Sequence, residues 1–383
     1  MNFSLNSKTL VNTKADCLVV ALPEKGDWPA STTEADSALG GLISKLQKAG
    51  DVSAKIAATS LIPLNDQPWS RLLVIGTGKD EDRPPSSFRK ALVAMTGSLK
   101  DGPSKTVLIA LSDTPVTGDD SARSELAKLS LIGRTLEDQL YTFNDFKSEK
   151  PPARKLSKIL IAASDTGKAH KEAFNLGLAT GRGMNFTRDL GNTPPNICHP
   201  VWLAEQASKM ASDHDCIKTD ILDEKQMQKL GMNSLLAVGR GSSQPSRLII
   251  MEYRGGNAKD KPHVLVGKGI TFDTGGISLK PGAGMDEMKY DMGLSVKIVT
   301  ERLMKSKAGI YSAVDDQYNQ TNVYVVYHLS NFADAKNDTD LAKAFERKET
   351  KFQRKDPDEA VAEEEKPVAT KPKATRKKTS TKE

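Results

Sequence analysis

The amino-acid sequence predicts an α/β protein with two α/β domains, the second with a mostly parallel central sheet that the chain leaves incomplete, and a disordered basic tail. Three observations predict this class. Short apolar runs alternate with longer stretches in which apolar residues recur at helical spacing. Glycines, prolines and other turn residues bound most of these runs. The end of the chain is rich in lysine, proline and threonine and has almost no large apolar side chain.

The first domain is predicted to span residues 1–150. Its expected strands are apolar throughout, as in strands that are buried on both faces, and they are residues 17–22, 71–76 and 106–111. Its expected helices are residues 37–49, 88–99 and 121–140. Gly76 and Gly78 follow a strand, but the full dinucleotide fingerprint and its acidic partner are absent, which disfavours a nucleotide-binding loop.

A second domain is predicted over residues 151–293, after a polar boundary segment that contains Pro151 and Pro152. Its expected strands are residues 158–163, 217–222, 235–238, 248–252 and 263–266, and its expected helices are residues 168–189 and 202–212. The repeated alternation of strand and helix predicts a mostly parallel sheet that is covered on both faces.

Residues 294–354 form an unassigned α/β segment. Residues 294–304 are compatible with a helix, residues 322–329 read as one strong strand, and residues 334–354 combine helical spacing with dense charge. Residues 355–383 are predicted to be a disordered basic tail.

The net charge of +6 belongs to the tail. Residues 366–383 contain seven lysines and arginines and one glutamate, which gives +6, so the preceding residues sum to zero. Two interpretations stay open: a basic arm that contacts nucleic-acid phosphates weakly and without sequence preference, or a solubilising tail. No aromatic residue is present there for base stacking.

A reducing, cytoplasmic location without a membrane partner is expected. The sequence contains no run of 18 apolar residues, and its start lacks the order of a secretory signal. The three cysteines, Cys17, Cys198 and Cys216, are too few and too scattered for a disulfide framework or a zinc ribbon.

The most informative stretch is residues 266–293, which is rich in glycine and follows an apolar strand. Its candidate site residues are Lys268, Asp273, Lys280 and Asp291. An α/β sheet presents polar sites at the carboxyl ends of its strands. Aspartates supply oxygen ligands for divalent cations, and a lysine can join them when its amine is deprotonated. These residues alone leave a metal site and a solvated ion pair equally open.

Other catalytic classes receive less support. The sequence has no His-Glu-x-x-His pair, which disfavours a single-zinc protease, and Ser242 and Ser243 lack the context of a nucleophile elbow. His199, beside Pro200, is expected to make a structural hydrogen bond.

The stretch 266–293 closely resembles the leucyl aminopeptidase (cytosol aminopeptidase) family of dinuclear metallopeptidases. Three earlier segments resemble the same family in the same order: residues 192–196 (Asn-Thr-Pro-Pro-Asn), 236–243 and 248–253. The resemblance covers residues 1–293 and is most specific from about residue 185 onward, whereas residues 294–383 are unlike the family.

This resemblance implies a metal-dependent aminopeptidase that releases N-terminal residues from peptide substrates. It implies that Lys268 and Asp291 bind one metal ion, that Asp273 bridges two, and that Lys280 helps to polarise the scissile carbonyl. It also implies two divalent cations, Zn²⁺ or Mn²⁺, and a homo-oligomer.

The sequence departs from the family at a second motif, Asn-Thr-Asp-Ala-Glu-Gly-Arg, which supplies further ligands. The nearest string, at residues 337–347, has the wrong spacing and reads as an exposed helix start. Without those carboxylates we expect one metal position to be almost empty and catalysis to be impaired. The alternative is a catalytically inactive truncated or fused derivative that acts as a binding or regulatory protein, with its basic tail touching nucleic acid. A third possibility is that residues 294–383 derive from a frameshift or gene fusion.

Overall fold

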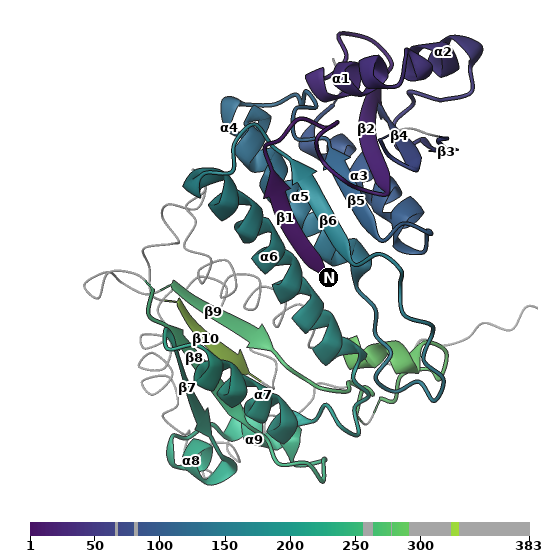
Figure 1. Cartoon of the computed structure of the whole chain (residues 1–383). Helices are drawn as coiled ribbons and strands as arrows, with labels where there is room; N and C mark the ends of the chain where they lie inside the picture. The colour runs from purple at the N-terminus through teal and green to yellow at the C-terminus, as the bar shows by residue number, and fades with distance from the viewer. Residues whose placement is uncertain (66–67, 80–82, 256–262, 277, 291–322, 329–383) are drawn as a thin grey trace, which may run out of the picture. The chain divides into compact units, whose positions relative to one another are not determined.

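The computed structural model describes residues 1–65, 68–79, 83–255, 263–276, 278–290 and 323–328 (Figure 1). These residues fall within one unit, residues 1–331. The helices predicted at 294–304 and 334–354, and the disordered tail predicted at 355–383, lie outside the described residues.

The first sheet has six strands in the order β1-β6-β5-β2-β4-β3. The strands are β1 (Asn2–Asn6), β2 (Cys17–Pro23), β3 (Thr59–Pro63), β4 (Arg71–Gly78), β5 (Thr106–Ala110) and β6 (Lys158–Ala162). All neighbouring pairs are parallel except β3–β4, which is antiparallel. The predicted α/β class is therefore confirmed, and this first sheet is mostly parallel.

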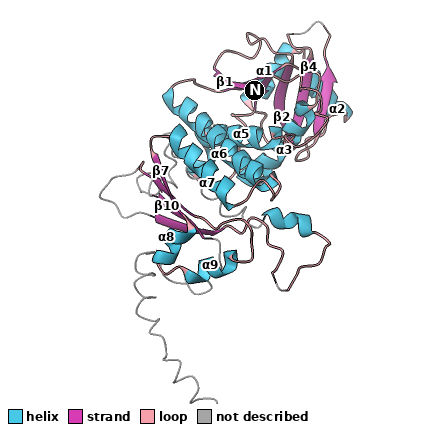
Figure 2. Cartoon of the chain, turned by 90° about the horizontal axis from the view of Figure 1, so that it is seen from below, coloured by secondary structure: helices cyan, strands magenta, loops and turns pink. Residues whose placement is uncertain are grey.

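Helices cover both faces of this sheet (Figure 2). They are α1 (Ala30–Ala38), α2 (Leu42–Ala49), α3 (Pro85–Lys100), α5 (Glu125–Leu140) and α6 (Lys168–Asn192). The short helix α4 (Asp120–Arg123) precedes α5. Val19 of β2 packs in an apolar cluster with Phe88 of α3, while its neighbour Leu18 packs in a second cluster with Ile43 of α2. Because successive strand residues face opposite sides, a strand covered on both sides must be apolar throughout.

The first sheet extends beyond the predicted boundary near residue 150. β6 follows that boundary and pairs with β1 and β5, and α4 and α5 supply the crossover that parallel β5 and β6 require. The division of the chain into domains at this point stays a prediction, but a strand from beyond it completes the first sheet.

α5 and α6 approach each other unusually closely, and three glycines make this possible. A Cβ atom added to Gly177 would lie 1.9 Å from the carbonyl oxygen of Ser130. One added to Gly181 would lie 2.4 Å from Cβ of Glu137, and one added to Gly133 would lie 2.8 Å from the carbonyl oxygen of Phe174. The two helix backbones therefore contact each other directly.

The second sheet has the order β7-β8-β10-β9. Its strands are β7 (Ile217–Leu222), β8 (Leu248–Tyr253), β9 (His263–Lys268) and β10 (Val323–His328), and its neighbouring helices are α7 (Pro200–Asp213), α8 (Glu224–Lys229) and α9 (Asn233–Gly239). α7 packs on this sheet through Ala207 and Met210, which cluster with Ile249 and Met251 of β8 (Figure 2). β10 confirms the strand predicted at 322–329.

Two features of this part differ from the expectation. The second sheet is mixed over its described strands, because β7–β8 and β8–β10 are antiparallel and β10–β9 alone is parallel. Mixed sheets often carry antiparallel strands beside parallel ones. The strand predicted at 235–238 is wrong: these residues lie in α9, with Leu235 buried and Val238 exposed. Four consecutive apolar residues do not distinguish a short strand from a helical turn.

Replacing Gly177 by alanine tests the contact between α5 and α6. The added methyl group has no room against the Ser130 carbonyl, so the free energy of unfolding should fall by about 1–3 kcal/mol or more. Urea denaturation measures this change. Gly97→Ala in α3 is the matched control, because no atom lies within 4 Å of the added Cβ. It should be neutral or stabilising by up to about 1 kcal/mol. Equal effects of the two substitutions would contradict the close approach.

Candidate metal centre

A glycine-rich loop follows β9 and carries the candidate site. Gly275 and Gly276 have φ values of 95° and 70°, in the left-handed region that favours glycine. The Gly275 amide donates to Oδ1 of Asp273 over 3.0 Å, and the Lys280 amide donates to the Thr274 carbonyl over 2.9 Å. The loop therefore turns back on itself and brings residues 273 and 280 to the same place.

Asp273 and Lys280 form an ion pair, with Nζ of Lys280 3.2 Å from Oδ2 of Asp273. A Cβ on Gly275 would lie 2.4 Å from the Ser278 carbonyl and 3.1 Å from the Lys280 amide, so this tight turn needs glycine. The two side chains are 24% and 35% exposed, and a pair that water reaches contributes about 1 kcal/mol or less. Both side chains therefore remain accessible for chemistry.

The structure places the four predicted site residues unequally. It brings Asp273 and Lys280 together, as described above. The backbone of Lys268 lies at the carboxyl end of β9, paired with His328 of β10, and its side chain is not described. Asp291 lies outside the described residues. The roles of Lys268 and Asp291 therefore stay predictions.

The donor chemistry of Asp273 fits a divalent cation. Its carboxylate is a hard oxygen donor, partly exposed, at the carboxyl-end loop of a strand. Over the residues that the structure describes, no three His, Cys, Asp or Glu side chains gather as a possible metal site. Asp273 thus has the donor chemistry of a metal ligand, and the side chains of Lys268 and Asp291, which are expected to join it, are not described.

A short 3₁₀ helix, η2 (Met285–Tyr290), closes the loop. Sδ of Met288 lies 3.1 Å from Nζ of Lys280, so η2 contacts the ion pair directly. The Tyr290 hydroxyl donates to Oδ1 of Asn192, at the end of α6, over 2.8 Å. The position of Lys280 is therefore linked to α6.

Three further polar residues surround the end of α6. Nδ2 of Asn192 donates to the Tyr141 hydroxyl over 3.1 Å, and that hydroxyl donates to Oδ1 of Asp189 over 2.8 Å. Burial raises the pKa of both Tyr141 and Asp189; the hydrogen bond between them raises the pKa of Tyr141 further and opposes the rise for Asp189. The Arg188 guanidinium lies over the ring of Tyr141, with Cζ of Arg188 5.2 Å from the ring centroid.

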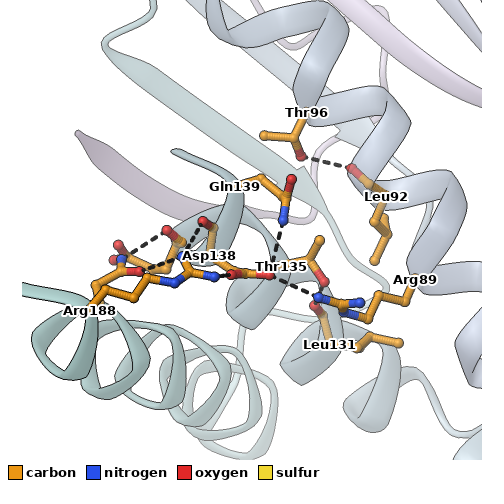
Figure 3. Close-up of polar contacts among 10 residues, drawn as sticks. Arg89, Leu92, Thr96, Leu131, Thr135, Asp138, Gln139 and Arg188 are labelled. Carbon is orange, nitrogen blue, oxygen red and sulfur yellow. Dashed lines mark hydrogen bonds and ion pairs between the residues drawn. The ribbon is translucent and has the colours of Figure 1, made fainter. Parts of the chain in front are cut away.

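Asp138 of α5, three residues before Tyr141, links three helices (Figure 3). Its side chain is 2% exposed; it pairs with Arg188 of α6 and, over 2.9 Å, with Arg89 of α3. Burial raises the pKa of Asp138, but the Gln139 hydrogen bond and the two arginines outweigh it and hold the pKa below its ordinary value. The carboxylate is therefore ionised and neutralised at neutral pH.

His199 makes the structural hydrogen bond that its place beside Pro200 predicts. Nδ1 of His199 accepts from the Trp202 amide over 3.4 Å and caps α7, so the predicted structural hydrogen bond is confirmed. Burial raises the pKa of Cys17 and Cys198 to about 12, which excludes thiolate chemistry by these two residues at neutral pH.

None of the helices in the described ranges has the length and apolar character needed to cross a membrane.

The sequence did not reveal the roles of Asn192, Tyr290, Tyr141 or Asp138. Asn192 and Tyr290 lie in segments that carry the family resemblance, but nothing in the sequence pairs them across 98 positions. Tyr141 and Asp138 belong to a stretch that shows helical spacing alone. One signal was available for Asp138: an acidic residue on the buried face of the helix predicted at 121–140 needs a charged or hydrogen-bonding partner.

Two models of one family match the chain. The model "cytosol aminopeptidase family, N-terminal domain" matches residues 19–150, and the model "cytosol aminopeptidase family, catalytic domain" matches residues 185–314. The second range contains the whole glycine-rich loop. It also continues to residue 314, whereas the resemblance was expected to stop at residue 293.

Curated relatives match over most of the chain. A probable cytosol aminopeptidase of Pseudomonas fluorescens strain Pf0-1 is 45% identical over 292 residues, which are 76% of this chain and 58% of that protein. The cytosol aminopeptidase of Pseudomonas aeruginosa is 43% identical over 294 residues, 76% of this chain and 59% of that protein. The chain thus spans less than two thirds of the length of these relatives.

Solved structures share the fold. A mutant of tomato leucine aminopeptidase superposes with a TM-score of 0.68 at 24% identity, covering 88% of this chain and 64% of that one. The bottromycin maturation enzyme BotP in complex with Mn superposes with a TM-score of 0.63 at 23% identity, covering 82% and 59%. At these identities the likeness shows the fold alone.

Asp138→Asn tests the charge network behind the site. It removes a buried negative charge that two arginines neutralise, and it should lower the free energy of unfolding by about 2 kcal/mol near neutral pH, less than for a fully buried pair because the arginines are half-exposed. The folded-state pKa lies below the unfolded-state value of about 4, so this stability is present above about pH 4 and lost as pH falls through the folded-state pKa.

Urea denaturation of wild type and Asp138→Asn over a pH series measures this effect. The difference in unfolding free energy should stay constant from about pH 8 to 5 and shrink below about pH 4. A difference that grows on acidification would contradict the assigned charge state.

Proposed function

The chain belongs to the cytosol aminopeptidase family through the residues that match its two domain models, and we propose that it is a metal-dependent aminopeptidase of the leucyl type. Its substrates would be peptides, from which it hydrolyses the N-terminal residue. The observation that carries this proposal is the ion pair of Asp273 and Lys280 in the loop after β9, inside the range that matches the family's catalytic domain.

A divalent cation, Zn²⁺ or Mn²⁺, would be held by Asp273 together with Lys268 and Asp291. The carboxylate of Asp273 suits such an ion, and Lys268 ends the strand from which the loop departs. When bound, the cation supplies Lewis-acid polarisation and an activated water. BotP, a structural neighbour, is described in complex with Mn, which makes Mn²⁺ the first ion to test.

Lys280 would act on the substrate carbonyl. Its Nζ lies in the turn next to Asp273, about one third exposed, where a peptide reaching Asp273 also meets it. A cation at this position stabilises the negative charge that develops on the carbonyl oxygen as the tetrahedral intermediate forms. Asp273 and Met288 hold this amine in place before substrate arrives, so little reorganisation is needed.

The absent second motif supports a finer proposal, that activity is impaired. The sequence holds no Asn-Thr-Asp-Ala-Glu-Gly-Arg, so the second cation would be weakly held and turnover low. The same observation favours an alternative: an inactive binding or regulatory protein whose basic residues 366–383 contact nucleic-acid phosphates weakly.

The names of its relatives suggest a cytosolic location. The homo-oligomer expected for the family is likewise a proposal.

A metal titration of the full chain with a leucine chromogenic substrate distinguishes these functions. Metal-dependent turnover with two tightly bound Mn²⁺ or Zn²⁺ ions would support an intact enzyme and overturn the proposed impairment. One weakly bound ion with low turnover would support an impaired enzyme. No turnover at any metal concentration would reject the aminopeptidase proposal. Salt-dependent binding to arbitrary DNA would then support the alternative.

Lys280→Met tests the role of the lysine. If Lys280 stabilises the developing oxyanion, kcat should fall about 10²- to 10³-fold with a smaller change in KM. Steady-state kinetics at saturating Mn²⁺ measures both constants. Lys209→Met, at an exposed position of α7, is the matched control and should keep the wild-type kcat. A similar kcat for both variants would reject this role for Lys280.

A further inference from the structure

Tyr290 connects the metal loop to the helical core. Its hydroxyl donates to Asn192 over 2.8 Å, and its ring lies beside Gly191, where an added Cβ would be 3.2 Å from the ring carbon Cδ1. The contacts described above for Asp273 and Lys280 are local to residues 273–288. The bond from Tyr290 instead joins this loop to the last turn of α6, 98 residues earlier.

The hydrogen bonds at this junction have a fixed direction. The single hydroxyl proton of Tyr141 goes to Asp189, so the Tyr141 oxygen can only accept, and the partner that donates to it must be Nδ2 of Asn192. That orientation turns Oδ1 of Asn192 toward Tyr290, which must therefore donate. Each group in this series donates one hydrogen bond to the next, and the Asp189 carboxylate is the final acceptor.

Tyr141 and Asn192, the two residues at the core end of this hydrogen-bond series, are held by the packing of α5 against α6. Tyr141 follows α5, and Asn192 ends α6, and the glycines of both helices bring their backbones into contact. Arg188, over the ring of Tyr141, is held by the buried Asp138, as Figure 3 shows. The groups that receive Tyr290 are thus fixed before the loop docks on them.

From η2 the chain of contacts continues to the ion pair, because Met288 touches the Lys280 amine and Lys280 pairs with Asp273. We propose that Tyr290, Asn192 and Tyr141 are positioning residues. They dock η2 on α6 and so fix the positions of the Asp273 and Lys280 side chains. The consequence for metal binding rests on the proposed function; the docking itself does not.

Hydrogen–deuterium exchange on the full chain tests the docking. Tyr290→Phe removes one hydroxyl bond and Tyr141→Phe removes two, while both keep the ring; only the bond from Tyr290 joins the loop to α6 directly. Amide exchange in residues 278–290 should accelerate about 2- to 10-fold, the factor expected for one lost hydrogen bond, while exchange in β2 and β5 stays at the wild-type rate. Thr135→Val is the matched control, since it removes a buried hydroxyl bond to Leu131 within α5 (Figure 3) that involves none of Tyr290, Asn192 and Tyr141.

Gly191→Ala separates positioning from general stability. The added methyl group presses on the ring of Tyr290, which is exposed enough to move away, while alanine favours the helix. Faster exchange of residues 278–290 with an unchanged or higher Tm should therefore result. Uniform acceleration across both sheets, or loop exchange equal to that of Thr135→Val, would overturn the proposal.

Mn²⁺ binding gives a second readout. If wild type binds Mn²⁺, Tyr290→Phe should raise its Kd by a similar factor of about 2 to 10, and Thr135→Val should leave the Kd unchanged. An unchanged Kd in Tyr290→Phe would reject the link from docking to the ligand residues. If wild type binds neither Mn²⁺ nor Zn²⁺, the proposed function fails, and the exchange measurements alone decide whether Tyr290 docks the loop.

Discussion

The close approach of α5 and α6 is the constraint on which the rest of the described structure depends. Gly133, Gly177 and Gly181 leave no space for side chains between the two backbones. This packing joins α5, which covers one face of the first sheet, to the long helix that leads toward the second sheet. It also brings polar residues of both helices within hydrogen-bonding distance of each other. A wider separation, which any side chain at these glycines would impose, would break those bonds.

Buried charge at this contact is tolerated because it is fully compensated. Asp138 is almost inaccessible to water, and an isolated carboxylate there would be strongly destabilising. Arg89 and Arg188 supply the neutralising charges from α3 and α6, so the network ties three helices together. Such a network contributes little net stability compared with apolar packing, but it specifies one alignment of the helices. That alignment places Tyr141 where it meets Asn192.

The candidate metal centre combines local and distant determinants. Left-handed glycines fold the loop so that Asp273 and Lys280 meet, and this part depends on residues close in sequence. The orientation of the loop depends instead on Tyr290 and α6. A partly exposed ion pair is too weak to hold such a loop by itself. Chemistry that needs ligands within a fraction of an ångström therefore relies on the helical core.

The sequence by itself determined the α/β class and most buried strands, because apolar periodicity and glycine turns are local properties. The family and the site candidates Asp273 and Lys280 followed from the resemblance of residues 266–293 to known sequences. The sequence missed the edge strands β1 and β3, in which polar residues interrupt the apolar signal, and assigned a strand to residues that form α9. Only the tertiary structure decided that β6 completes the first sheet, that the second sheet is mixed over its described strands, and that Tyr290 meets Asn192. The physical reason is that strand partners and side-chain hydrogen bonds depend on packing between segments far apart in the chain, which residue spacing along the chain does not encode.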